Sequence, residues 1–241
     1  MPEKKISVKK NTRTPDKNAG IDVYFKKIFT LMFGAVGITA ITTFITIYLG
    51  GIKLLVSTGG MTPFFYIMVF GGLALSIWAQ ARAFSMRPAV AAILLFIYAV
   101  MIGFALTPII WGGLAVNPVS ILWAFIIAAI MFACMAMFGY KTAKNLSFLG
   151  VFLMMGMIGL ILVGIVSMIW TLGGVFSTIV CAVGVLVFAL FTAYDMQNLK
   201  NAYKVLGDDM QKDQLAVLGA LHLYISFIAM FQYVLGLLNR N

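Results

Sequence analysis

Residues 117–162 read NPVSILWAFIIAAIMFACMAMFGYKTAKNLSFLGVFLMMGMIGLIL. Two long apolar runs stand on either side of a short polar segment, KTAKNLS, that carries two lysines. A helix of about 20 mostly apolar residues is long enough to cross the hydrocarbon layer of a bilayer. Pro118 opens the first run, and proline suits the first turn of a helix. This stretch therefore predicts two membrane-spanning helices joined by a short basic loop.

The same pattern extends over most of the chain. Of its 241 residues, 63% are hydrophobic and 10% are charged, and the mean hydropathy is +1.05. A soluble domain would carry far more charge. The sequence therefore predicts an all-α membrane protein with seven transmembrane helices, the last of them capped by Asp213. The expected spans are 28–50, 63–83, 88–110, 118–139, 148–170, 175–198 and 215–238.

The basic residues divide the chain into two parts and set its orientation. Residues 1–27 are expected to be a basic, flexible cytoplasmic tail, and residues 28–241 a seven-helix transmembrane domain. Cytoplasmic segments of membrane proteins carry an excess of Lys and Arg. The tail carries eight such residues and the segments 82–87, 140–147 and 199–214 carry two, two and three, which leaves only Lys53 and Arg240 elsewhere. This pattern predicts a cytoplasmic N-terminus and an external C-terminus.

The orientation has one alternative, in which the last span is re-entrant and both termini are cytoplasmic. The span is long enough to cross, which favours seven crossings. We expect an integral, multi-pass protein of a bacterial cytoplasmic (inner) membrane, with the lipid bilayer as its surroundings. An organelle membrane is the other possibility. The net charge of +10 does not indicate nucleic-acid binding, because the basic residues form no stripe on a soluble face.

No catalytic or metal-binding constellation stands out. The chain has one histidine, seven acidic residues and neither a phosphate-binding loop nor a nucleophile elbow, so we do not expect an enzyme. Cys134 and Cys181 fall inside apolar runs and lack the CxxC spacing of a metal site. No metal and no cofactor are therefore expected.

Asp195 is the exception to this apolar character. It lies in the segment FTAYDMQNLK, residues 191–200, and is the only carboxylate inside any of the apolar runs. Its expected place, about three residues before the end of its span, brings it near the negative end of the helix dipole. That position and partial burial both favour the neutral, protonated carboxyl. Asp195 is interpreted either as a titrating acid at a cytoplasmic gate or as an acid that reaches interfacial water.

Several stretches resemble one known family. They are NAGIDVYFKKIFTLM (18–32), the opening stretch 117–162, FTAYDMQNLK (191–200) and ALHLYISFIAMFQYVLGLL (220–238). In this order they resemble a bacterial-type member of the Bax inhibitor-1, or transmembrane BAX inhibitor motif, family. The resemblance implies six helices packed around a central seventh. Better-studied members are described as pH-sensitive calcium leak channels or as anti-apoptotic, stress-protective membrane proteins, and a bacterial branch is linked to a membrane-bound AAA protease.

The resemblance also implies a site of two residues, and this chain has only one of them. Channel-like members use two aspartates, in spans 6 and 7, that share a proton and set the pore open or closed with pH. The first falls on Asp195. The second falls on Ser226, because the family's LYLD reads LYIS here. The two-aspartate sensor therefore cannot operate in this chain as it is described for the family.

His222 is the one histidine, and it offers a substitute for the missing carboxylate. His222 and Ser226 are four residues apart and share a helix face. We expect Asp195, His222 and Ser226 to form a pH-sensing or gating cluster, although His222 is equally compatible with a neutral ring that is bonded to a backbone carbonyl or faces interface water.

Three further residues are candidates to support this cluster. Tyr194 and Tyr224 are interpreted as hydrogen-bond donors to it or as packing and interface rings. Arg82 is interpreted as a partner that neutralises Asp195 or as a snorkelling basic residue.

Two functions follow from these residues. The first is a leak for Ca²⁺ or another cation, gated by protonation at Asp195. The second is a non-conducting regulatory membrane protein that binds a membrane AAA protease or another stress or quality-control partner. A single carboxylate is a poor site for Ca²⁺, which prefers several oxygen ligands. A polar cavity that reaches Asp195 would favour the leak, and a dry apolar core would favour the regulatory protein.

Overall fold

The computed structural model describes residues 17–170 and 173–239, and within these ranges the chain is almost entirely helical. Seven of the helices are long and apolar enough to cross a membrane, which confirms the all-α, seven-span fold class. The elements are α1 (Lys17–Tyr48), α2 (Ile52–Leu55), β1 (Val56–Ser57), β2 (Gly60–Met61), α3 (Pro63–Ala81), α4 (Pro88–Val116), α5 (Pro118–Lys141), α6 (Ser147–Ile169), α7 (Gly174–Val205) and α8 (Asp209–Leu238).

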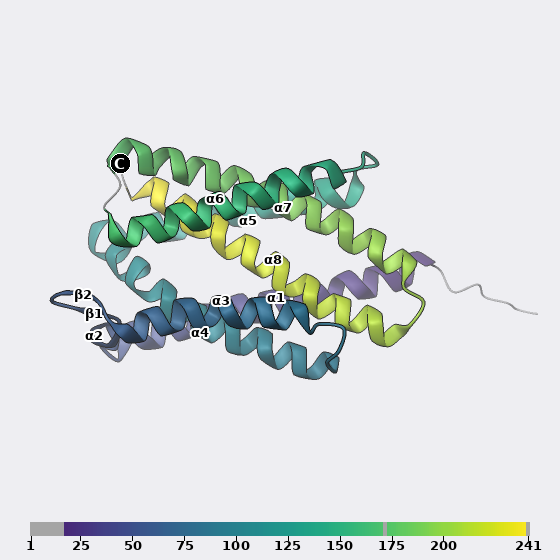
Figure 1. Cartoon of the computed structure of the whole chain (residues 1–241), viewed down its shortest axis with the longest axis horizontal. Coiled ribbons are helices and arrows are strands. Elements are labelled where there is room, and N and C mark those ends of the chain that lie inside the picture. Colours follow the sequence, from purple (N-terminus) through teal and green to yellow (C-terminus); the bar gives the residue numbers. More distant parts are fainter. Residues whose placement is uncertain (1–16, 171–172, 240–241) are drawn as a thin grey trace, which may run out of the picture.

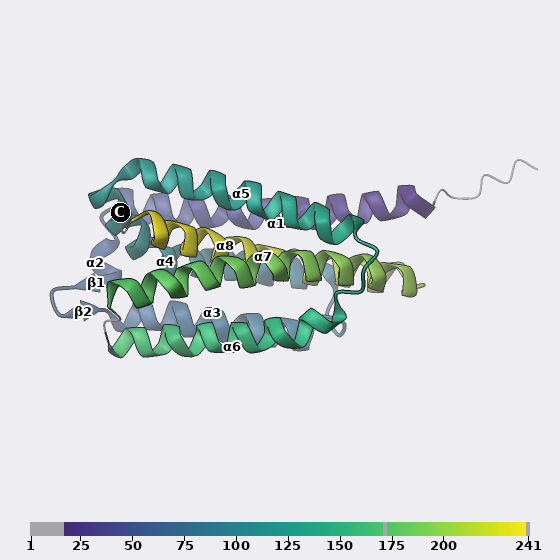
Figure 2. The same cartoon turned by 90° about the horizontal axis from the view of Figure 1, so that it is seen from above.

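The long helices lie in three layers. Figure 2 shows α1 and α5 on one side, α4, α8 and α7 in the middle, and α3 and α6 on the other side. Helix α8 packs mainly against α1, α4, α5 and α7, whereas α3 packs against α4 and α6 against α7. The middle layer therefore has two faces, each flanked by a pair of helices.

Helix α8 is the most buried of the spans. Its most apolar stretch is 78% buried, against at most 33% for any other span. Its principal neighbours are nevertheless four helices, because α3 and α6 lie against α4 and α7. The arrangement of six helices around a central seventh, which the family resemblance implies, is therefore not confirmed.

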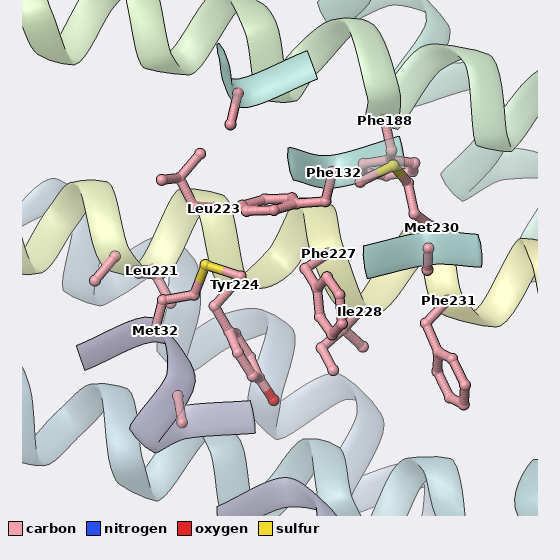
Figure 3. Packing of buried hydrophobic residues seen from close by; sticks show 14 of the residues in the cluster. Met32, Phe132, Phe188, Leu221, Leu223, Tyr224, Phe227, Ile228, Met230 and Phe231 are labelled. Atoms are coloured by element: carbon pink, nitrogen blue, oxygen red, sulfur yellow. The ribbon is translucent and has the colours of Figure 1, made fainter. Parts of the chain in front are cut away.

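Close packing holds α8 in place. Figure 3 shows its side chains meeting those of the surrounding helices, and Phe227 lies edge-to-face on Phe132 with ring centroids 5.7 Å apart. Lipid tails are as apolar as the helices, so dispersion contacts rather than water exclusion favour this association. Small residues let backbones approach closely. A Cβ on Gly139 of α5 would overlap the backbone carbonyl of Ala193 on α7.

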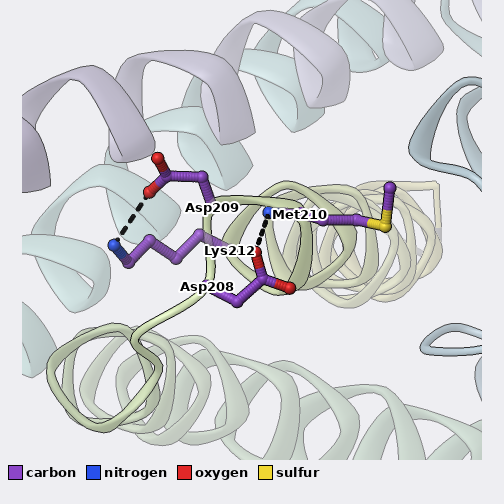
Figure 4. Close-up of polar contacts among 4 residues, drawn as sticks. All are labelled: Asp208, Asp209, Met210 and Lys212. Atoms are coloured by element: carbon purple, nitrogen blue, oxygen red, sulfur yellow. Dashed lines mark hydrogen bonds and ion pairs between the residues drawn. The ribbon is translucent and has the colours of Figure 1, made fainter.

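The helix starts follow the sequence closely. Proline occupies the first turn of α3, α4 and α5, as the positions of Pro63, Pro88 and Pro118 predict. The expected cap of the last span is wrong, because Asp208 and not Asp213 accepts the Met210 N–H, at 3.2 Å (Figure 4).

Four helix boundaries differ from those expected. Helix α1 begins at Lys17, α4 continues to Val116, α7 continues to Val205 and α8 begins at Asp209. The early start of α1 has a packing cause, because Ile21, Tyr24 and Phe25 are buried against the bundle. No break therefore separates residues 17–27 from the first span. Residues 1–16 of the expected tail lie outside the described residues.

The connections gather at two ends of the bundle. The loops 82–87, 142–146 and 206–208 and the start of α1 lie at one end, and the β1–β2 hairpin lies at the other (Figure 1). We call the first the basic end, because these loops and the adjoining helix ends carry most of the lysines and arginines of the described chain. The basic connections that the sequence predicts on one side of the membrane thus lie together.

Candidate functional site

A cavity of about 340 Å³ lies on one face of the middle layer, between α3, α6, α7 and α8. Most of its wall is apolar, but six residues with polar side chains also line it. These residues are Gln80, Tyr194, Asp195, Asn198, His222 and Ser226. The structure thus brings Asp195, His222, Ser226 and Tyr194, four of the residues that the sequence singles out, around one space.

Asp195 lies deeper in its helix than expected. Helix α7 runs ten residues further, to Val205, which is about 15 Å at the helical rise. The helix dipole acts over the last turn only, so the expected unfavourable contact with the helix C-terminus does not arise. The side chain is half-buried, and within 17–170 and 173–239 its carboxyl group forms neither a hydrogen bond nor an ion pair. Asp195 is thus a carboxylic acid inside the bundle with no partner among the described residues.

His222 is bonded to an amide rather than to the acid. It lies 13 residues into α8, about 20 Å from the start of that helix. Its Nε2 is 2.9 Å from Oε1 of Gln80, and the Gln80 amide nitrogen donates to the Ser76 carbonyl at 3.1 Å. Because the amide nitrogen is engaged there, Oε1 faces the imidazole and Nε2–H is the donor.

The expected direct pair of His222 with Asp195 is therefore not formed. In the described part of the chain, no hydrogen bond or ion pair joins the two side chains. They share the cavity wall instead, with room between the helices for water.

Ser226 and Tyr194 complete the polar part of the wall. The Ser226 side chain is buried and has no hydrogen-bond partner among the described residues. The Tyr194 hydroxyl lies against Gly150 of α6, where an added Cβ would be 2.5 Å from it. Glycine at this position therefore allows Tyr194 to reach between α6 and α7.

Tyr224 and Arg82 lie away from the cavity. Figure 3 shows the Tyr224 hydroxyl pointing away from α7, and it lies 2.6 Å from the Thr39 hydroxyl of α1. Arg82 is exposed at the end of α3 and forms no ion pair with any described residue. Of the alternatives that the sequence left open, these positions agree with a packing ring for Tyr224 and a snorkelling residue for Arg82.

With this geometry established, comparison with known proteins gives one family. Residues 21–241 match the family model described as inhibitor of apoptosis-promoting Bax1. The chain belongs to the Bax inhibitor-1 family. It is a multi-pass integral membrane protein, as the seven long apolar helices independently indicate.

Bacterial relatives share most of the length of this Bax inhibitor-1 protein. An uncharacterised protein of Borreliella burgdorferi is 31% identical over 90% of the chain and 92% of the relative. One from Caulobacter vibrioides is 35% identical over 76% and 72%. The inner membrane protein YbhL of Escherichia coli K12 is 29% identical over 92% and 94%.

The site of this Bax inhibitor-1 member has one carboxylate. Ser226, at the position of the family's second aspartate, lines the same cavity as Asp195 but carries no charge. Within the described ranges, no group of three or more His, Cys, Asp and Glu residues is placed to hold a metal ion. The arrangement can therefore hold water and exchange a proton, but it offers few oxygen ligands to a cation.

Sequence reasoning missed two amide residues that organise the site. Gln80 gave a weak signal, as an isolated amide in the last turn of an apolar run. Gln197 belongs to the FTAYDMQNLK segment, and its role is now visible. Its Oε1 accepts from the Leu146 N–H at 2.8 Å and its Nε2 donates to the Lys144 carbonyl at 2.7 Å. The buried amide thus fixes the 142–146 loop to α7, two residues from Asp195.

Two further side chains fix the basic end. Lys200 Nζ donates to the Tyr140 carbonyl at the end of α5, at 2.6 Å. Gln214 Nε2 donates to the carbonyls of Met86, at 2.8 Å, and Phe84, at 3.3 Å. Helices α7 and α8 thereby hold the loops that follow α3 and α5, and the cavity lies just beneath these loops.

Proposed function

We propose that the chain is a leak for Ca²⁺ or another cation, gated by protonation of Asp195. One observation carries this proposal: Asp195 has no hydrogen-bond or ion-pair partner among the described residues and lines a cavity of about 340 Å³ with five other polar residues. An isolated ionisable group inside a membrane protein is a functional-site hypothesis by default, because its burial is costly. On this proposal the chain is not an enzyme, since it moves ions without changing a bond.

The gate follows from the charge of one carboxyl group. An ionised Asp195 attracts cations into the cavity, and a protonated Asp195 does not. A hard divalent cation that meets only one carboxylate is held weakly, and a conducting site must release its ion. A site of this kind suits the passage of cations better than their tight binding.

The apolar part of the wall supplies the closed state. Phe188, Phe191 and Ile225 line the cavity together with the polar residues. Hydrophobic constrictions close channels by losing water. Loss of the Asp195 charge removes the group that best holds water beside these rings, so protonation favours the dry, closed cavity.

We also propose a place and an orientation for the protein. The relative from Escherichia coli K12 is named an inner membrane protein, and we assign this chain to the bacterial inner membrane as well. The positive-inside rule puts the basic end in the cytoplasm, and with it the chain's N-terminus, while the C-terminus lies outside. The cavity then lies nearer the cytoplasmic surface.

Ion flux into proteoliposomes tests the leak. Purified protein is reconstituted with a Ca²⁺ indicator trapped inside, and flux is compared with that of empty liposomes and of the Asp195→Asn variant. Flux that exceeds the empty liposomes and depends on Asp195 supports the proposal. The absence of flux for Ca²⁺, Na⁺ and K⁺ at every pH refutes it.

The second candidate is a non-conducting regulator that binds a membrane AAA protease or another stress or quality-control partner. The lone carboxylate favours it, because Asp195 is the one carboxylate that lines the cavity and no group of three or more His, Cys, Asp and Glu residues in the described chain is placed to hold a metal ion. Co-purification of a membrane protease from the native membrane, together with absent flux, would support this function over the leak.

A further inference from the structure

An apolar groove runs along the opposite face of the middle layer, between α1 and α5. Two cavities make it up, of about 580 Å³ toward the basic end and about 550 Å³ toward the other end. Val36, Phe125 and Phe227 line both cavities, so the two adjoin each other along α1 and α5. Helices α1 and α5 each pack on α8 but make few contacts with one another, and the two cavities lie between them.

The groove is apolar along its length. Phe25, Phe29 and Phe33 line it from α1 at spacings of four residues, and Ala133 lines it from α5. Ala133 is exposed, so nothing from the bundle covers this part of the wall. A dry, elongated space that opens toward the bilayer is filled by apolar material, because water gains no hydrogen bonds there.

Charges of both signs stand at the basic end of the groove. Asp22 of α1 and Lys141 of α5 both line it, and both side chains are exposed. In the part of the chain that the structure describes, neither forms an ion pair; the pairs found there join Lys27 to Asp213 and Lys212 to Asp209. The groove thus has an apolar body and a mouth at which Asp22 and Lys141 form no ion pair with any described residue.

We propose that this groove binds one phospholipid with a zwitterionic, primary-amine headgroup, such as phosphatidylethanolamine. An acyl chain lies between α1 and α5 over Phe227, Lys141 contacts the phosphate and Asp22 contacts the headgroup amine. A partner's transmembrane helix would fill the apolar body but would leave both charges without partners, so the charge pattern favours the lipid. The site is separate from the Asp195 cavity and does not depend on the proposed leak.

Photolabelling tests this site in the full-length protein. The protein is reconstituted in phosphatidylglycerol vesicles with a trace of phosphatidylethanolamine that carries a diazirine on one acyl chain, and labelled peptides are mapped by mass spectrometry. We expect labelling concentrated on α1 and α5 and displaced by unlabelled phosphatidylethanolamine. Ala133→Trp should lower it by about threefold or more, because the new ring occupies the groove. Cys134→Trp is the matched control, since Cys134 is exposed on α5 but lines neither cavity.

The headgroup assignment has its own variant. Unlabelled phosphatidylethanolamine should displace the probe from the wild-type protein better than phosphatidylcholine does, because phosphatidylcholine has no primary amine. Asp22→Asn should keep the labelling but make the two lipids equal as competitors. Equal labelling of α3 and α6 would mean that the probe reports only bulk bilayer lipid, and it would overturn the proposal. The proposal would also be overturned if Ala133→Trp and Cys134→Trp lowered the labelling equally, or if unlabelled lipids displaced the probe equally well whatever their headgroup. A disulfide between two chains that carry Ala133→Cys and, to remove the exposed native thiol beside it, Cys134→Ser would assign the groove to a second copy instead.

Discussion

His222 and Gln80 are hydrogen-bonded through Nε2 and Oε1 at 2.9 Å, on the wall of the cavity that also contains Asp195. The bond ties α8 to α3 and gives the imidazole a neutral partner. Asp195 is left without a charged neighbour among the described residues. His222 and Asp195 therefore share the cavity wall without a direct bond between them.

Gln80 and His222 should be energetically coupled. We expect Gln80→Leu and His222→Leu each to lower stability, and the double variant to be no worse than the poorer single one, with a coupling energy of about 1 kcal/mol. The measurement is thermal unfolding in detergent for all four proteins. Strictly additive losses would show that the hydrogen bond contributes nothing. Cation flux through His222→Leu should keep its pH dependence.

Gln197 should stabilise the folded protein through its two hydrogen bonds. Gln197→Leu removes both hydrogen bonds to the 142–146 loop and leaves a buried N–H and a carbonyl without partners. We expect a loss of about 2–4 kcal/mol. Gln197→Glu keeps the acceptor and should cost less. Asn198→Ala, next to it but without a described hydrogen-bond partner, is the control, and chemical denaturation in detergent measures all three. An unfolding free energy for Gln197→Leu equal to that of Asn198→Ala would contradict the loop assignment.

The contact between α5 and α7 should tolerate no side chain at Gly139. Gly139→Ala places a methyl group on the Ala193 carbonyl, whose backbone cannot move without shifting α7. We expect a loss of about 2 kcal/mol or more, as for an overpacked core. Gly159→Ala, where a Cβ meets nothing within 4 Å, should change stability by less than about 0.5 kcal/mol. Similar melting temperatures for the two variants would place the helices further apart than described.

Much of this architecture could be read from the sequence because lipid imposes simple rules. A spanning helix must be long, apolar and internally hydrogen-bonded, so runs such as 88–110 and 118–139 indicate their helices directly. The chain's prolines also mark three helix starts correctly. Boundaries beyond the hydrocarbon layer follow no such rule. Helix α7 continues to Val205, with Leu199 buried against α8 and Ala202 and Tyr203 packed on the core, and hydropathy does not reveal these tertiary contacts.

The site was predictable in its members and not in its bonds. Asp195 is conspicuous in the sequence as the one acid inside an apolar run. The spacing of His222 and Ser226 predicts that they share a helix face, and both line the same cavity as Asp195. The partner of His222 was missed because Gln80 lies 142 residues away in sequence, on a helix that no local pattern assigns to α8. For Tyr224 the sequence left open a hydrogen bond to the cluster or a packing ring, and its place two positions along the helix from His222 directs it to Thr39.

The orientation of the bundle can be measured with reporter insertions. Alkaline phosphatase inserted at Gly59, in the exposed β1–β2 hairpin, should be active, because the proposed orientation puts this hairpin outside the cytoplasm. The same enzyme inserted at Gly207, in the α7–α8 loop, should be inactive, because the positive-inside rule puts the basic end in the cytoplasm. The reverse pattern would mean that the protein has the opposite orientation in the membrane. Activity at both sites would mean that the chain crosses the membrane a different number of times.

The most direct test of the leak is the ratio of Ca²⁺ flux at pH 8 to that at pH 6 in proteoliposomes. Deprotonation of Asp195 charges the cavity at the higher pH, so the wild-type protein should conduct severalfold more Ca²⁺ there. Asp195→Asn should conduct weakly and equally at both pH values. Asp209→Asn, which removes an exposed carboxylate outside the cavity, should behave as the wild type. A pH-dependent flux that survives in Asp195→Asn, or no flux above empty liposomes, would contradict the assignment of the gate to Asp195.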